Sequence, residues 1–419
     1  MPNLSLDLRS IIDDAIKAVL PEAAVRDALN HPAFSARKDK GKIVVASIGK
    51  AAWRMAKAAS DILGSSITGA VVTKYHHSMG DIAGLEIFEA GHPVLDENTI
   101  KGTKALLQHV KNLSPDDTVL FLVSGGGSAL FELPAEGATL ADMQDISSQL
   151  LACGADIVEI NTIRKHLSSV KGGRFAQLCA PAHVFMVVLS DVLGDRLDSI
   201  ASGPAAPDSS TSQEALAIVK KYNLNIKPEL MRILAQETPK SLDNVTATIT
   251  GSVTALCEAA ANLAKSRGYN PIVLTTTMTC EAREAGSFMA SVAREVKTSG
   301  RPVAAPCAVI AGGETVVHLT GKGLGGRNQE FALAAAEGIA GLDGVVVASL
   351  GSDGTDGPTD AAGGIVDGNT AAALKANGIN IPDVLHNNDA YHALKAVDAL
   401  LMTGPTGTNV NDVAIALIG

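Results

Sequence analysis

Several predicted strands end in glycines and polar residues that could bind an anion. The apolar run 118–123 leads directly into Ser124, Gly125, Gly126, Gly127 and Ser128. Glycines lack the Cβ that keeps a ligand away from the backbone, and amides in such a turn suit a phosphate or carboxylate. No Lys-Ser/Thr pair follows, so this is not a Walker A loop. A sharp turn without a ligand has the same pattern, so this stretch alone identifies no function.

Two charged residues also follow predicted strands directly. Lys50 comes after the strand 42–48 and near the start of a helix, where a cation could stabilise charge on a phosphoryl group during transfer. An ordinary exposed lysine is the alternative. Asp191 follows the strand 184–189, where a carboxylate could act as a general base or bind Mg²⁺.

A basic segment lies between these positions, in a chain that is acidic overall. Residues 161–174 carry Arg164, Lys165, His166 and Lys171 next to a pair of glycines. Such a concentration of cations suits an anionic substrate. A solvated basic helix face would explain the same pattern.

The second half of the chain repeats the pattern of strands ending in polar turns. Gly312, Gly313 and Glu314 follow one predicted strand, and a turn containing Asp353 and Thr355 follows another. Carboxylate and hydroxyl oxygens suit Mg²⁺ or a nucleotide ribose, so Asp353 joins Asp191 as a predicted metal ligand. An Asp-rich turn without a ligand is the alternative.

Residues 321–326 match the G-x-G-x-x-G pattern of dinucleotide-binding proteins and precede a predicted helix. A nicotinamide cofactor is therefore a competing prediction. However, no acidic residue ends a strand about 20 residues further on, as that fingerprint requires. Arg327, at the start of the helix, fits a phosphate clamp better.

The elements that position these residues alternate between strand and helix, which predicts parallel or mixed sheets. The predicted strands of the first half are 42–48, 69–73, 118–123 and 184–189, and those of the second half are 245–250, 271–276, 308–311, a hairpin-like 315–319 and 344–350. Prolines between 203 and 245 place a linker and hinge near 235–245, which divides the chain into domains 1–240 and 241–419. The polar strand ends are expected to line a cleft between the two domains.

Composition excludes several classes of protein. The chain has 419 residues, a net charge of −10 and no basic cluster large enough for nucleic acid. No apolar run is long enough to span a membrane, and residues 1–7 lack the features of a signal peptide. The five cysteines form no CxxC pair, which indicates reduced thiols in a cytoplasmic protein. The oligomeric state, a homodimer included, stays open.

Taken together, the motifs resemble those of the class II glycerate 2-kinases. The N-terminal part of that family is similar to residues 124–128, 164–174 and 190–191, and its MOFRL region (about 305–412 here) is similar to 312–315, 325–331 and 351–357. Some members are named hydroxypyruvate reductase. The resemblance spans nearly the whole chain, in order.

The resemblance implies a Rossmann-like N-terminal domain, a second α/β domain and an active site in the cleft between them. It further implies Mg²⁺-assisted transfer of phosphate from ATP to the 2-hydroxyl of D-glycerate. The catalytic residues of the family fall on Lys50, Asp191 and Arg327. We expect the basic segment (Arg164, Lys165, His166, Lys171) to hold glycerate, and the glycine and aspartate turns to hold nucleotide and metal. The alternatives are an NAD(P)H-dependent hydroxypyruvate reductase and a non-catalytic sugar-acid sensor.

Overall fold

The computed structural model describes residues 4–194 and 196–419, so Met1–Asn3 lie outside the described residues. The chain forms two compact units. One unit comprises residues 21–250, and the other comprises residues 251–419 together with helix α1 (Leu4–Ala18). The predicted boundary near 240 thus lies in the loop before strand β6, and the N-terminal helix belongs with the second unit. None of the described helices is long and apolar enough to cross a bilayer.

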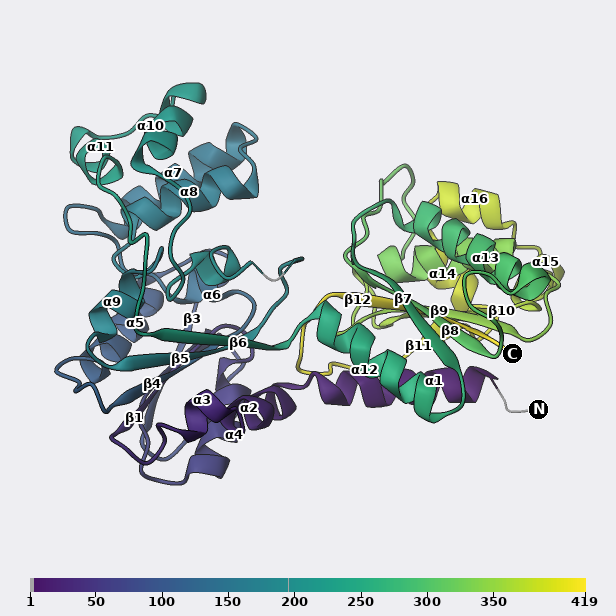
Figure 1. The fold of residues 1–419 in the computed structure, drawn as a ribbon. Helices are drawn as coiled ribbons and strands as arrows, with labels where there is room; N and C mark the ends of the chain where they lie inside the picture. The colour runs from purple at the N-terminus through teal and green to yellow at the C-terminus, as the bar shows by residue number, and fades with distance from the viewer. Residues whose placement is uncertain (1–3, 195) are drawn as a thin grey trace. The chain divides into compact units, whose positions relative to one another are not determined.

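The unit 21–250 is built on a six-stranded sheet with the order β3-β2-β1-β4-β5-β6 (Figure 1). Its strands are β1 (Ile43–Ile48), β2 (Thr68–Lys74), β3 (Leu85–Ala90), β4 (Thr118–Val123), β5 (His183–Leu189) and β6 (Val245–Gly251). The pairs among β1 to β5 are parallel. All six residues of β4 are buried, as expected for a central parallel strand covered on both faces.

Helices cover this sheet and also form a group of their own. The helices are α2 (Pro21–Leu29), α3 (Pro32–Ser35), α4 (Ala52–Leu63), α5 (Glu97–His109), α6 (Gly127–Leu130), α7 (Leu140–Ala152), α8 (Ile157–Leu167), α9 (Arg174–Cys179), the 3₁₀ turn η1 (Ile200–Ser202), α10 (Ser212–Lys221) and α11 (Pro228–Leu234). Helices α7, α8, α10 and α11 gather around a small apolar core that includes Ile146, Ile163 and Leu230 (Figure 1). Arg164 lies on α8, so this group carries part of the basic segment.

The second unit has a six-stranded mixed sheet with the order β11-β10-β9-β12-β8-β7. Its strands are β7 (Asn270–Met278), β8 (Cys307–Gly313), β9 (Val345–Gly351), β10 (Gly363–Asp367), β11 (Leu400–Leu401) and β12 (Asp412–Ile418). The last strand of the chain, β12, runs antiparallel between β8 and β9. Its first residue, Asp412, therefore pairs with Gly313 and Gly351, the final residues of those two strands.

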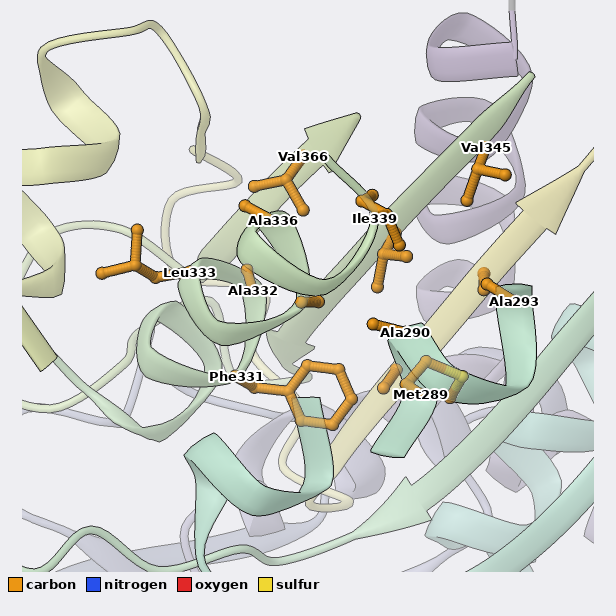
Figure 2. Packing of buried hydrophobic residues seen from close by; sticks show 14 of the residues in the cluster. Met289, Ala290, Ala293, Phe331, Ala332, Leu333, Ala336, Ile339, Val345 and Val366 are labelled. Atoms are coloured by element: carbon orange, nitrogen blue, oxygen red, sulfur yellow. The ribbon is translucent and has the colours of Figure 1, made fainter. Parts of the chain in front are cut away.

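Helices lie on both faces of the mixed sheet (Figure 1). They are α1, α12 (Val253–Ser266), α13 (Ala282–Ser299), α14 (Arg327–Gly338), α15 (Thr370–Ala376), α16 (Ile381–His386) and α17 (Ala390–Lys395). Ala290 of α13 lies against Gly338 of α14, so small residues let the two helices pack closely. Met289, Phe331 and Ala332 belong to the same buried core (Figure 2). This core fixes α14, whose first residue is Arg327.

The predicted hairpin-like strand at 315–319 is wrong. Within this stretch, only Val316 forms an isolated bridge, with Glu281. Leu319 is 82 % exposed, so the alternating sequence has no neighbouring strand on which to bury its apolar face. The segment before residues 321–326 is therefore irregular.

Candidate active site

The glycine turn after β4 lies beside Lys50. The Lys50 amide donates to the Gly125 carbonyl (2.9 Å), and the Ala51 amide donates to Ser124 Oγ (3.0 Å). Neither the amide of Gly125 nor that of Gly126 has a hydrogen-bond acceptor within residues 4–194 and 196–419. The same holds for the Lys50 ammonium group in that described part of the chain. Unpaired amides next to a lysine can bind an anion.

Asp191 covers the same turn from the end of β5. A Cβ added to Gly125 would lie 2.3 Å from Asp191 Oδ2, so the carboxylate packs directly on the glycine backbone. A Cβ added to Gly126 would lie 3.3 Å from Lys50 Cγ. Glycine is needed here because side chains would displace the two charged residues. The structure thus brings Lys50, Asp191 and Ser124–Gly127 together.

The basic segment separates into one open residue and three that are held by the protein. Lys165 forms a buried ion pair with Asp208 (3.0 Å), and the side chain of Lys165 is 6 % exposed. The His166 imidazole is fully buried, and its Nδ1 lies 2.9 Å from the Thr162 carbonyl. Burial lowers the pKa of His166 and favours its neutral form.

Lys171 lies beneath the glycine turn. Its ammonium group donates to the carbonyls of Ser128 (2.9 Å) and Phe131 (2.8 Å) and lies 3.6 Å from Glu132 Oε2. The side chain is fully buried, and burial lowers its pKa. These contacts fit a role in shaping the turn. Arg164, by contrast, lines a cavity.

Arg327 heads a second cluster, at the edge of the mixed sheet where Asp412 begins β12. Its guanidinium donates twice to Asp412 (Nε to Oδ2, 2.5 Å; Nη2 to Oδ1, 3.1 Å) and once to Glu314 (3.1 Å). Of the five guanidinium N–H groups, two are left for a ligand. Burial raises the pKa of Asp412, and the pairing with Arg327 opposes that shift.

The other predicted residues of this unit make local contacts. Asp353 Oδ1 accepts from the amide (3.0 Å) and hydroxyl (3.1 Å) of Thr355, which closes the turn after β9. A Cβ on Gly312 would lie 2.5 Å from Cys257 Sγ, and one on Gly313 would lie 2.2 Å from the Met278 carbonyl oxygen. Both glycines are thus required by packing, whatever they bind.

The G-x-G-x-x-G stretch lacks the surroundings that a dinucleotide site needs. No strand leads directly into it, since β8 ends at Gly313, and Cβ atoms on Gly321 and Gly323 would clash with the backbone of residues 387–389. Asp356 accepts from the amides of Asn328 (3.1 Å) and Gln329 (2.8 Å), the helix amides that would face a pyrophosphate. The pattern arises from chain packing.

For Mg²⁺, the available residues are few. Among the described residues, no three His, Cys, Asp or Glu side chains gather in a way that could hold a metal ion. Mg²⁺ usually binds proteins through one or two carboxylates and completes its shell with substrate phosphates and water. Asp191, beside two unpaired amides, fits this type of site.

Two functional candidates are not predicted from the sequence. Asp412 lies in a strand that local sequence patterns do not predict, and His92 follows β3, which they do not predict either. Asp356 belongs to the predicted aspartate turn, but it caps α14 through the Gln329 amide. Had β3 been recognised, the Gly91-His92 pair after it would have matched the other polar strand ends.

Comparison with known proteins identifies the family of this chain. Residues 7–235 match the model of a domain of unknown function (DUF4147), and residues 307–412 match the MOFRL family. A D-glycerate 2-kinase of Thermotoga maritima is 56 % identical, with 97 % of each chain covered. The chain belongs to the glycerate 2-kinase family.

A solved structure and a protein with a different name extend the comparison. The crystal structure of a glycerate kinase from Thermotoga maritima superimposes with a TM-score of 0.96 at 55 % identity, covering both chains completely. A protein of Agrobacterium vitis, named provisionally as a hydroxypyruvate reductase, is 41 % identical over 90 % of this chain and all of its own. The two α/β units are thus the glycerate 2-kinase fold, and the predicted fold class is confirmed.

Proposed function

We propose that this protein is an ATP-dependent D-glycerate 2-kinase. The observation that supports this activity best is the group formed by Lys50, Asp191 and the two unpaired amides of Gly125 and Gly126, in a chain so similar to a D-glycerate 2-kinase. A cation and free amides suit a phosphoryl group, and the carboxylate beside them suits a hydroxyl acceptor.

In this proposal, the 2-hydroxyl oxygen of glycerate attacks the γ-phosphorus of ATP. A new O–P bond forms, the bond from the γ-phosphorus to the bridging oxygen breaks, and ADP leaves. Asp191 orients the hydroxyl and accepts its proton. Lys50 and Arg327 neutralise the charge on the phosphoryl oxygens, so catalysis depends on position and electrostatics.

The substrate and nucleotide contacts follow from the same assignment. Arg164 binds the glycerate carboxylate, because Lys165, His166 and Lys171 already have partners within the fold. The turn Ser124–Ser128 holds phosphates, and the Glu314 and Asp353 turns of the second unit serve the nucleotide. Asp191 and Asp353 are the residues that would hold Mg²⁺, which would neutralise charge on the phosphates.

The direct test is ³¹P NMR of the product formed from D-glycerate and Mg-ATP, which we expect to be 2-phosphoglycerate. Lys50→Ala and Arg327→Ala should each lower ADP formation at least 100-fold, whereas Lys57→Ala, on the exposed face of α4, should not. Near-normal turnover in both variants would remove these roles.

Two controls address the alternatives. Oxidation of NAD(P)H with hydroxypyruvate, without ADP from glycerate and ATP, would identify a reductase. Binding of glycerate without turnover of either kind would identify a sensor. Loss of activity in EDTA and its return with Mg²⁺ would support the metal requirement.

A further inference from the structure

A cavity of about 360 Å³ opens beside the glycine turn, entirely within the unit 21–250. It is lined by Gly126 and Ser128 of the turn, by Met143 and Leu151 of α7, and by His92 and Arg164. Most of its surface is apolar. A cavity of this size with a few polar groups is typical of a small-molecule site.

Two basic groups that line the cavity make no hydrogen bond within the described residues. No hydrogen bond to the His92 imidazole or to the Arg164 guanidinium occurs within residues 4–194 and 196–419, although the Glu132 carboxylate also lines the cavity and attracts the charge of Arg164. Two polar neighbours are already engaged, since Ser128 lies 3.2 Å from Ser202 Oγ and Gln144 donates to the Leu95 carbonyl (2.9 Å). Partly buried groups left without hydrogen-bond partners are expected to bind something else.

His92 lies at the glycine turn itself. A Cβ added to Gly126 would lie 2.9 Å from His92 Cδ2 and 3.0 Å from His92 Nε2. The same Cβ would lie 3.3 Å from Lys50 Cγ, so His92 and Lys50 both lie against Gly126. Burial lowers the pKa of His92, and the positive charge of Lys50 lowers it further. The ring is therefore neutral near pH 7, with one N–H donor and one acceptor nitrogen.

We propose that His92 contacts the acceptor acid and hydrogen-bonds its 3-hydroxyl group, while Arg164 binds its carboxylate. A hydroxyl both donates and accepts, as does a neutral imidazole, whereas a carboxylate pairs better with the guanidinium fork. This assignment makes His92 a specificity-determining residue. It rests on the proposed glycerate kinase activity.

The test compares D-glycerate with D-lactate, which differs only by lacking the 3-hydroxyl. Dissociation constants are measured for both acids by calorimetry, together with kcat/KM for glycerate. The variants are His92→Phe, which keeps a ring without polar atoms, and His92→Ala, in case the larger ring does not fit. His183→Ala is the control, because His183 is a partly buried histidine of the same sheet, whose pKa burial also lowers, and it bonds Thr246 instead.

We expect the wild type to bind glycerate about tenfold or more tightly than lactate, since one hydrogen bond to a buried group is at stake. Either His92 variant should weaken glycerate binding and leave lactate binding unchanged, so that the ratio approaches one. His92→Gln, which keeps a donor, should restore part of the ratio. His183→Ala should leave it unaltered.

An unchanged ratio, or an equal loss for both acids, would overturn the role of His92. A merely structural histidine would weaken the two acids alike. The proposed function fails in a different way, since the wild type would then form no ADP from glycerate. The two results are therefore distinguishable.

Discussion

Arg327, the first residue of α14, is held by both oxygens of Asp412, the first residue of β12. The two residues are 85 positions apart in sequence, and Asp412 is only 3 % exposed. Bidentate pairing fixes the plane of the guanidinium as well as its position. The orientation of the proposed phosphate-binding arginine therefore depends on the last strand of the chain.

Asp412→Ala should destabilise the protein by about 3 kcal/mol, because a partly buried arginine loses its main partner. It should also lower kcat at least tenfold, since Arg327 would no longer be oriented. Urea unfolding and the ADP assay measure the two effects. Glu314→Gln is the matched control for stability alone, because the more exposed Arg327–Glu314 pair should contribute less than about 1 kcal/mol. Equal losses of stability in both variants would contradict the special role of Asp412.

Gly125→Ala should lower activity about 100-fold, because the new methyl group would lie 2.3 Å from Asp191 Oδ2 and must displace it. Gly154→Ala is the control, because it also lowers the free energy of unfolding but lies away from the site. Gly154 has φ 73° and open space around it, so alanine there costs about 1 kcal/mol of backbone strain without touching the site. Retained activity in Gly125→Ala would show that Asp191 does not act where it lies.

Lys165→Met should destabilise the fold by about 3 kcal/mol, because it leaves the Asp208 carboxylate buried without its ammonium partner. The double variant with Asp208→Asn should recover part of the loss. At a temperature where each variant is folded, kcat should stay within about twofold of the wild type. A loss of kcat without a loss of stability would instead show that Lys165 binds the substrate.

The stability of the protein should depend on pH through Asp356. Burial raises the pKa of this carboxyl to about 6 in the folded state, above its ordinary value of 3.8. The folded state then binds more protons than the unfolded state between about pH 4 and pH 6, so the free energy of unfolding falls as pH rises through that window. The contribution is on the order of 2–3 kcal/mol.

Asp356→Asn tests this dependence, because it removes the titrating group. The difference in unfolding free energy between wild type and variant should change between pH 4 and pH 6 and stay constant above pH 7. The variant also loses a helix cap at Gln329, which lowers its stability by about 1 kcal/mol at any pH. A difference that does not vary with pH would rule out the raised pKa.

Local patterns in the sequence predicted much of the first unit correctly. The strands that became β1, β4 and β5 are continuous apolar runs, and the polar residues after them were identified because strand ends are chemically distinct. The pairing of strands that are distant in sequence could not be predicted. The position of β12 between β8 and β9 depends on contacts between distant parts of the chain, so neither Asp412 nor its link to Arg327 was visible.

The basic segment shows a second limit. Sequence alone could not distinguish a lysine that faces a ligand from one whose buried carboxylate partner lies 43 residues away, as with Lys165 and Asp208. His92 shows the reverse case, a residue that the sequence did not mark as a candidate for ligand binding. Only the fold places it against Gly126, which is far from it in sequence.

Helix α1 is the first element of the chain, yet it packs within the second unit, where the Thr408 hydroxyl donates to the Val19 carbonyl across 389 positions. On a ribosome adding about 5–20 residues per second, Thr408 is synthesised roughly 20–80 seconds after Val19. Helix α12, which packs against α1, is synthesised within that interval, after residues 21–250. Until then the apolar face of α1 is exposed, and chaperones bind surfaces of this kind. Residues 251–419 expressed without the first twenty should accordingly be far less soluble than the fragment 21–250.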